Sequence, residues 1–333
     1  MNANPLRIVF HGQNAAQFRP GMEALIGNRH QIETVDDDLS TDAAMEAFTR
    51  ADVLIGIRLQ APMPPLHQLR LYHAPAAGTD AIDASLLPPG CSLCNCFGHE
   101  QAIAEYVFAA LLIGHVPLAQ ADRDLRQQRW TYWAGAPGAL RTELGSQTLG
   151  IIGLGHIGQT IAARARAFGM RVHGCNRSAG PADCVDQFWP LDQLDNFMAS
   201  IDAVVVTLPL LPDTRSLVGA RALAALAPHA VLINVGRGPV VDEQALYEAL
   251  KSRRLNAAII DTWYRYPSAG QTTAAPAHLD FASLDHVLMT PHMSGWTHGT
   301  VRRRQQTLAD NIQRLAEGRP LLNLLRGPTP RSN

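Results

Sequence analysis

The sequence carries almost no net charge and contains no long uninterrupted apolar run. Its 28 Lys and Arg residues nearly balance its 29 Asp and Glu residues, so the formal net charge is −1. Proteins that bind nucleic acid or anionic membranes usually present a broad basic face, which this composition does not favour. No apolar stretch approaches the roughly eighteen residues of a transmembrane helix, and the N-terminus, MNANPLRIVF, lacks the pattern of a signal peptide. We therefore expect a cytoplasmic protein with no nucleic-acid or membrane partner.

Cysteine is also infrequent, and the five residues present form an odd number, which argues against a disulfide framework. Cys91, Cys94 and Cys96 lie close together in the sequence. A structural zinc site needs four ligands, however, and His99 is the only further candidate nearby. We expect these cysteines to be small buried residues on a strand and its following turn, and we expect no metal site.

The most informative stretch, residues 149–178, reads as a strand, a glycine-rich turn, a helix and a second strand. Gly153, Gly155 and Gly158 stand at G-x-G-x-x-G spacing directly after the first strand. The first glycine allows a tight turn, the second lets a pyrophosphate approach the backbone, and the third lets the helix pack closely on the strand. The free N–H groups at the start of the helix favour an anion. This unit predicts a site for a dinucleotide cofactor.

Segments with the pattern of strands alternate with helical segments along the rest of the chain, which predicts parallel sheets covered by helices on both faces. The expected strands are 7–10, 32–35, 52–57, 69–73, 91–94, 149–152, 171–174, 203–207, 231–235, 257–260 and 287–289. The expected helices include 15–26, 42–49, 100–118, 191–199, 220–226, 242–250 and 297–317. We therefore predict an α/β protein with two doubly wound parallel sheets, whose ligands lie at the carboxyl ends of the strands.

Three residues with reactive or charged side chains follow the later strands. Arg237 stands between two glycines at the end of one strand, where a guanidinium is suited to binding a carboxylate and polarising a neighbouring carbonyl. Asp261 ends the next strand and is expected either to orient a nicotinamide ring or only to cap the following turn. His292 lies in the turn after the last strand, where it is placed for proton transfer near neutral pH.

Several segments in the right order resemble the D-isomer-specific 2-hydroxyacid dehydrogenase family over nearly the full chain. They are AAGTDAID, AIAEYVFAALL, GIIGLGHIG, VVVTLPLLPDTRSLV, LINVGRGPVVDEQALYEAL, AAIIDTW and TPHMSG. The resemblance implies a Rossmann cofactor domain, residues 99–295, inserted in a flavodoxin-like substrate domain formed by residues 1–98 and 296–333. It also implies a homodimer, because dimers are common in this family.

The resemblance further implies hydride transfer between a nicotinamide cofactor and C2 of a small acid. The expected substrate is a 2-oxo acid such as glyoxylate or hydroxypyruvate, reduced to a D-2-hydroxy acid. Arg237 matches the arginine that binds the carboxylate, and His292 matches the acid/base. Backbone N–H groups of Ala77 and Gly78 are expected to help hold the carboxylate, with Arg58 in the same pocket. The cofactor is expected to contact the carboxyl ends of the strands at Gly153, Gly155, His156, Ile157, Gly158, Asn176, Arg177, Ser178, Leu208, Pro209, Thr214, Val235, Gly236, Arg237, Asp261, His292 and Gly295.

The first departure from the family pattern concerns the partner of the histidine. The family places a glutamate five residues after the aspartate, whereas this chain has Tyr266 there. A tyrosine can orient the imidazole by a hydrogen bond, but it stabilises an imidazolium less well than a carboxylate does. The hypothesis is that His292 remains the acid/base with Tyr266 as its orienting partner, and that the pH optimum lies below that of glutamate-bearing relatives.

The second departure concerns the choice of cofactor. An NAD-preferring site has an acidic residue at the end of the second strand, where this chain reads Asn176, Arg177 and Ser178. No acid repels a 2′-phosphate there, and Arg177 with Ser178 could bind one. The sequence therefore favours NADP over NAD. The alternative is that Arg177 stacks on the adenine without discriminating.

Two other functions stay open. One is oxidation of a small anion, as in formate or phosphite dehydrogenases, and the other is a non-catalytic dinucleotide-sensing binding protein. The segment 122–144 carries Trp130, Tyr132 and Trp133 close together. It is either a surface loop or, as the density of aromatic residues suggests, part of a subunit interface.

Overall fold

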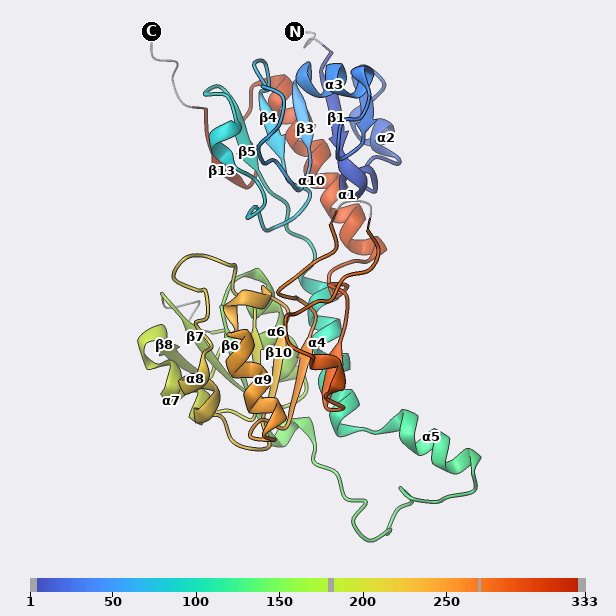
Figure 1. Cartoon of the computed structure of the whole chain (residues 1–333), viewed down its shortest axis with the longest axis vertical. Helices are drawn as coiled ribbons and strands as arrows, with labels where there is room; N and C mark the ends of the chain where they lie inside the picture. Colours follow the sequence, from blue (N-terminus) through green and yellow to red (C-terminus); the bar gives the residue numbers. More distant parts are fainter. Residues whose placement is uncertain (1–4, 179–182, 269–270, 329–333) are drawn as a thin grey trace. The chain divides into compact units, whose positions relative to one another are not determined.

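A computed structural model describes residues 5–178, 183–268 and 271–328 (Figure 1). The chain forms two compact units. Unit 1 comprises Met1–His99 and Trp296–Asn333, and unit 2 comprises Glu100–Gly295. The first boundary therefore lies between residues 99 and 100, one position after the expected one.

Unit 1 contains a six-stranded sheet in the order β13-β5-β4-β3-β1-β2. Its strands are β1 (Arg7–His11), β2 (Gln31–Val35), β3 (Val53–Ile55), β4 (Leu71–His73), β5 (Ser92–Cys94) and β13 (Leu324–Arg326). The first five strands pair in parallel in the flavodoxin-like order 2-1-3-4-5. The short β13, which the sequence pattern did not predict, pairs antiparallel with β5 and closes that edge of the sheet.

The helices of unit 1 are α1 (Gly12–Ala16), α2 (Met22–Ile26), α3 (Asp42–Thr49) and α10 (His298–Glu317). The single helix predicted over residues 15–26 was wrong, because Pro20 and Gly21 separate α1 from α2 and Gly21 has a φ of 81°. Leu308 and Ile312 of α10 are buried in the core cluster that includes residues of β1, β3 and β4. The last part of the chain thus completes the core of the unit that the first part begins.

A buried polar network joins β4 to α10 and to the segment before β13. The His73 side chain is fully buried, and its Nε2 lies 2.8 Å from Nδ2 of Asn311. Asn311 also donates to the Leu322 carbonyl (3.0 Å) and accepts from the Leu322 N–H (2.7 Å). Burial lowers the pKa of His73 to about 4, so the imidazole is neutral at physiological pH and its Nε2 accepts from the asparagine.

Unit 2 contains a seven-stranded sheet in the order β12-β11-β10-β9-β6-β7-β8, and all its neighbouring strands are parallel. Its strands are β6 (Thr148–Ile152), β7 (Arg171–Asn176), β8 (Gln187–Pro190), β9 (Ala203–Val206), β10 (Val231–Asn234), β11 (Ala257–Ile260) and β12 (Val287–Met289). The strand order reverses between β6 and β9, which is the Rossmann switch point where a dinucleotide binds. The fold class expected from the sequence is confirmed.

The helices of unit 2 are α4 (Glu100–His115), α5 (Leu118–Arg126), α6 (His156–Ala167), α7 (Leu194–Ala199), α8 (Ala220–Ala225) and α9 (Glu243–Lys251). The helix expected over residues 100–118 ends at His115, and after Pro117 the chain resumes as α5 at an angle of 47°. Among the described residues, no single helix is long and apolar enough to cross a membrane. Only α4 and α5 together, as a bent pair, meet that criterion by length and composition.

The buried His73 predicts that stability depends on pH in a defined range. The folded-state pKa is about 4, against about 6.5 in an unfolded chain. Between these values the unfolded chain binds a proton that the folded protein does not, so the free energy of unfolding should be highest above pH 6.5 and should fall toward pH 4. The loss attributable to His73 should reach about 3 kcal/mol.

Urea denaturation at pH 7, 6, 5 and 4 measures this dependence. His73→Gln should flatten the curve by roughly that amount, whatever its effect on absolute stability. Part of the slope should persist, since burial also lowers the pKa of His11. An unchanged slope in the variant would contradict a neutral buried His73.

Candidate active site

The glycine-rich turn of unit 2 leaves open space in front of the first turn of α6. Gly153 has a φ of 102°, and its carbonyl accepts a 2.7 Å hydrogen bond from the Thr207 hydroxyl. A Cβ at Gly158 would collide with the Gly153 carbonyl oxygen, so this position requires glycine. A Cβ at Gly155 would meet nothing within 4 Å. His156 and Ile157 begin α6 beside this space, where free helical N–H groups suit a phosphate.

The end of β7 carries the residues expected to choose between cofactors. The Asn176 side chain donates to the Ser178 carbonyl at 3.1 Å. The guanidinium of Arg177, which is 75% exposed, lies 3.2 Å from Asp213 in the loop after β9. An exposed pair of this kind contributes little stability, so Arg177 can exchange this partner for another anion.

The loop after β9 is held against the end of β10. Thr214 is buried; its hydroxyl accepts from the Leu211 N–H and donates to the Pro209 carbonyl, both at 2.7 Å. A Cβ at Gly236 would lie 2.6 Å from the Leu208 carbonyl oxygen. Leu208 of this loop and Val235 at the end of β10 are both buried, so the loop packs closely at this edge of the sheet.

The turn that presents Arg237 depends on Asn234, the last residue of β10. The buried Asn234 side chain accepts from the Gly236 N–H and donates to the Arg237 carbonyl, both at 3.1 Å. The half-buried Arg237 guanidinium donates to the Gly236 carbonyl at 2.9 Å. We had not identified Asn234 from the sequence; the available signal was an amide side chain at the junction of an apolar strand and a glycine-bearing turn.

Asp261 follows β11 and is fully buried. One of its carboxylate oxygens accepts from the Thr290 hydroxyl (2.7 Å) and the Met293 N–H (2.9 Å), and the other accepts from the Ser294 N–H (3.0 Å). Both oxygens therefore hold the turn that follows β12. The turn that Asp261 holds is therefore the one after β12, about thirty residues away, and not the turn directly after Asp261 that the sequence suggested. The same turn carries His292.

Two further side chains fix this turn, and neither was identified from the sequence. The Trp263 indole N–H donates to the Thr290 carbonyl at 2.8 Å, and the Tyr106 hydroxyl of α4 lies 2.7 Å from the Thr290 hydroxyl. Burial raises the pKa of Tyr106, so its hydroxyl stays protonated. Their partners lie far away in the sequence, so no local pattern marks them.

His292 and Tyr266 are in direct contact. The Tyr266 hydroxyl lies 3.0 Å from Nδ1 of His292, and it accepts a 3.1 Å hydrogen bond from the Trp263 backbone N–H. His292 has a φ of 57°, a conformation that non-glycine residues rarely adopt. The hydrogen bonds between Asp261 and the turn hold the backbone of His292 in this conformation. The structure thus brings together the two side chains that the sequence suggested as partners.

The expected substrate-binding residues lie in unit 1, at the carboxyl ends of β3 and β4. The Arg58 side chain is exposed and donates to the Gln60 side chain at 3.2 Å. Ala77 and Gly78 lie in the loop after β4, where the Ala77 carbonyl accepts a 2.7 Å hydrogen bond from the buried Asn95 side chain. Asn95, which we had not identified from the sequence, thus anchors this loop to the end of β5.

Most of unit 2 matches the model of one known protein family. Residues 108–294, which contain the glycine-rich turn, Arg237, Asp261 and His292, match the model of the D-isomer specific 2-hydroxyacid dehydrogenase NAD-binding domain. The chain belongs to the D-isomer specific 2-hydroxyacid dehydrogenase family.

Curated members of this family resemble the chain at moderate identity. The D-3-phosphoglycerate dehydrogenase of Mycobacterium leprae is 32% identical over 301 residues, which are 87% of this chain and 54% of that protein. The hydroxypyruvate reductase of Thermotoga maritima is 28% identical over 294 residues, 86% of this chain and 92% of that one. The chain thus spans about half the length of the phosphoglycerate dehydrogenases that it matches.

A solved structure of the same family shows a similar fold. The D-isomer specific 2-hydroxyacid dehydrogenase of Xanthobacter autotrophicus, in complex with NADPH, is 25% identical. It aligns with a TM-score of 0.76 over 97% of this chain and 98% of that one.

The three closely spaced cysteines do not present thiolates in this family member. Cys91, Cys94 and Cys96 are buried, and burial raises the pKa of each thiol to about 12. Within the described part of the chain, no group of three or more His, Cys, Asp or Glu side chains is placed to hold a metal ion.

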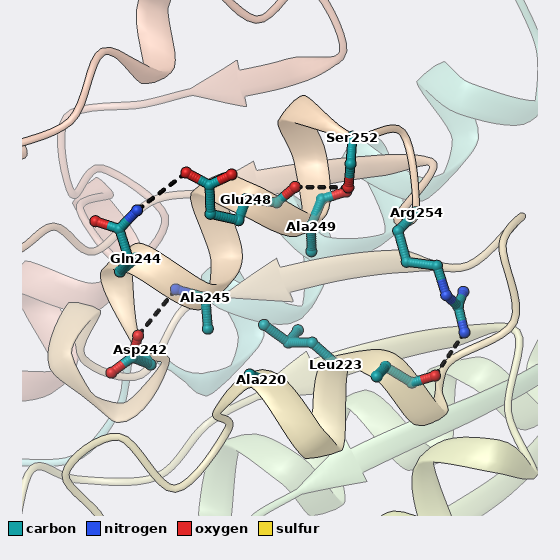
Figure 2. A pocket seen from close by; sticks show the side chains of 10 residues that line it. Ala220, Leu223, Asp242, Gln244, Ala245, Glu248, Ala249, Ser252 and Arg254 are labelled. Atoms are coloured by element: carbon teal, nitrogen blue, oxygen red, sulfur yellow. Dashed lines mark hydrogen bonds between the residues drawn. The ribbon is translucent and has the colours of Figure 1, made fainter.

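An open groove between α8 and α9 lies apart from these residues (Figure 2). Its polar groups bond to the helices that form it: Asp242 caps α9 through the Ala245 N–H at 2.9 Å, and Gln244 donates to Glu248 at 3.0 Å. Arg254 donates to the Ala224 carbonyl at 2.5 Å. None of the expected site residues lines this groove, so we place the candidate site at the strand ends instead.

Proposed function

We propose that the protein is an oxidoreductase that transfers a hydride between NADPH and a small 2-oxo acid or D-2-hydroxy acid of the glyoxylate or hydroxypyruvate type. The observation that carries the proposal is the contact between His292 and Tyr266. Asp261 holds the turn that contains His292, and the glycine-rich turn and Arg237 belong to the same unit of the chain. A histidine and an arginine at neighbouring strand ends suit reduction of a carbonyl that carries a carboxylate.

The residues around the glycine-rich turn fit a bound dinucleotide, because the space at Gly155 is open and the first turn of α6 faces it. When bound, the cofactor supplies the hydride. Arg237 then binds the substrate carboxylate and polarises the adjacent carbonyl, and His292 exchanges a proton with the C2 oxygen. In unit 1, the backbone N–H groups of Ala77 and Gly78, with Arg58, are proposed to contact the substrate carboxylate.

Turnover of a panel of acids tests this proposal. Reduction of glyoxylate, hydroxypyruvate and larger 2-oxo acids is measured with NADPH and NADH, together with oxidation of formate and phosphite. We expect turnover of at least one 2-oxo acid. Arg237→Gln should lower kcat/KM by about a hundredfold or more and Arg237→Lys by less, because lysine keeps the charge but not the bidentate geometry.

His292→Gln should lower kcat by about a hundred- to ten-thousandfold, with cofactor binding retained. Turnover of formate or phosphite alone would favour the small-anion alternative. Cofactor binding without turnover of any acid would favour a dinucleotide-sensing protein.

The preference for NADPH rests on Arg177 and Ser178 at the end of β7. We expect kcat/KM to be higher with NADPH than with NADH. Arg177→Asp should lower kcat/KM for NADPH by about ten- to hundredfold and leave that for NADH within a few-fold, since only NADPH carries the 2′-phosphate. Arg221→Asp, which breaks another exposed ion pair of the same unit, is the matched control. Equal efficiencies with both cofactors would refute the preference.

We propose that the protein is a homodimer that pairs through α5 and the chain that follows it. Figure 1 shows this segment extending away from the sheet of unit 2. Its exposed apolar side chains are Leu118, Leu125, Trp130, Tyr132, Trp133 and Leu140. Monomeric proteins rarely expose so many large apolar side chains on one segment. Analytical ultracentrifugation should detect a dimer that Trp130→Ser combined with Trp133→Ser weakens, whereas Met45→Ser in unit 1 should not. A monomer at all concentrations would exclude this arrangement.

A further inference from the structure

The phenolic oxygen of Tyr266 contacts two groups of different kinds, a backbone N–H and an imidazole nitrogen. The Trp263 backbone N–H lies 3.1 Å away and can only donate, so the Tyr266 oxygen accepts from it. The second partner is Nδ1 of His292, at 3.0 Å. An imidazole nitrogen can either accept or donate, and the direction of this second bond depends on where the ring proton lies.

The neutral imidazole is the form that matters above pH 6.5 or so, the ordinary pKa of histidine. In this form Nδ1 can accept the proton of the Tyr266 hydroxyl, which the Trp263 N–H cannot accept. The ring proton then resides on Nε2, the nitrogen that would face a substrate oxygen. A neutral imidazole in this tautomer is a very weak acid by itself, so a second proton must follow the one that leaves.

We propose that Tyr266 is the proton source for carbonyl reduction, acting through the imidazole of His292 as a relay. This inference rests on the proposed 2-oxo acid reduction and assigns its acid. As the hydride reaches C2 and the C2–O π bond becomes the alkoxide lone pair, the Nε2–H proton of His292 moves to that oxygen. The Tyr266 proton moves to Nδ1 at the same time, which leaves a neutral imidazole and a phenolate. Water then protonates the phenolate, and the imidazole gains a proton on Nε2 as it loses the one on Nδ1, which restores the starting tautomer.

The surroundings of Tyr266 suit each step of this proton relay. The Trp263 N–H points at the oxygen on which negative charge develops, and such a bond stabilises the charged form. Tyr266 is 49% exposed, so the phenolate can be reprotonated from solvent. The indole of the same Trp263 holds the Thr290 carbonyl, so one residue fixes both the tyrosine oxygen and the histidine turn.

The other titratable and charged groups on the neighbouring elements do not replace Tyr266 in this step. Both oxygens of the buried Asp261 accept hydrogen bonds from the turn, and the Tyr106 hydroxyl lies against Thr290. Arg237, at the end of β10, is bonded to the Gly236 carbonyl, and Arg265 is exposed beside Tyr266 in the chain.

The pH dependence of reduction separates a proton source from an orienting partner. If Tyr266 only orients the ring, activity requires imidazolium and should decline tenfold per pH unit above about 6.5. If Tyr266 supplies the proton, activity should persist until the phenol itself ionises, near pH 10. The relay thus reverses the expectation of a low pH optimum that an orienting tyrosine gives.

The experiment is the pH profile of kcat from pH 5 to 11 with the best 2-oxo acid of the panel. Coenzyme deuterated at the transferred position verifies that hydride transfer limits the rate. The wild type should hold its activity to about pH 9. Tyr266→Phe should match it within a few-fold at pH 5.5 and fall at least about a hundredfold below it at pH 9. Tyr247→Phe, a half-buried tyrosine of α9 in the same unit, should keep the wild-type profile.

Fluorotyrosine at position 266 provides the second test, because its phenol is more acidic and its shape is nearly unchanged. It should move the alkaline limb to lower pH, and it decides the question if Tyr266→Phe fails to fold. Identical alkaline limbs in the wild type and Tyr266→Phe, or a limb unmoved by fluorotyrosine, would overturn the relay. Absence of any turnover by the wild type would instead refute the proposed function.

Discussion

The carboxylate of Asp261 is the constraint on which the candidate site depends. It is completely buried, and a buried carboxylate is stable only when hydrogen-bond donors surround it. Thr290, Met293 and Ser294 supply these donors, and in doing so they fix the turn after β12. His292 lies inside that turn with a positive φ. The same hydrogen bonds therefore stabilise both the buried carboxylate and the strained backbone of His292.

The strand order of unit 2 explains how residues distant in the sequence meet. Neighbouring parallel strands place their carboxyl ends on one edge, so Arg237 after β10, Asp261 after β11 and His292 after β12 follow consecutive positions across the sheet. The helices and loops then adjust each side chain. Asn234 shapes the arginine turn, and Trp263 connects the aspartate segment to both Thr290 and Tyr266.

Much of the fold followed from local sequence patterns, because apolar strands, glycine turns and helix caps act over a few residues. The doubly wound sheets and the glycine-rich turn are examples, and most strand positions were found within one or two residues. The prediction of one helix over 15–26 was wrong because the apolar residues there have helical spacing although Pro20 and Gly21 interrupt the helix. The edge strands β13 and β8 were missed; both are short, and each pairs with a single neighbouring strand, β5 and β7 respectively.

The site residues also differ in whether the local sequence reveals them. Arg237 and His292 stand in recognisable segments, and the replacement of a glutamate by Tyr266 follows from aligning the Asp261 segment with the family pattern. Asn234, Thr290, Tyr106 and Asn95 act through partners that only the folded chain supplies. The hydrogen bond from the Trp263 backbone to Tyr266 has no side-chain signature at all, since it depends on the path of the main chain after β11.

The division of unit 1 between the two ends of the chain sets an order for its assembly during synthesis. Strands β1 to β5 leave the ribosome before unit 2, which spans Glu100–Gly295, whereas α10 and β13 leave it after unit 2. Yet α10 covers the core of these strands, and β13 pairs with the edge of β5. Unit 2 is continuous and can fold while unit 1 still exposes apolar surface and an open strand edge. A chaperone that recognises such surfaces therefore has its longest opportunity on the segment of β1 to β5, although this segment is made before unit 2.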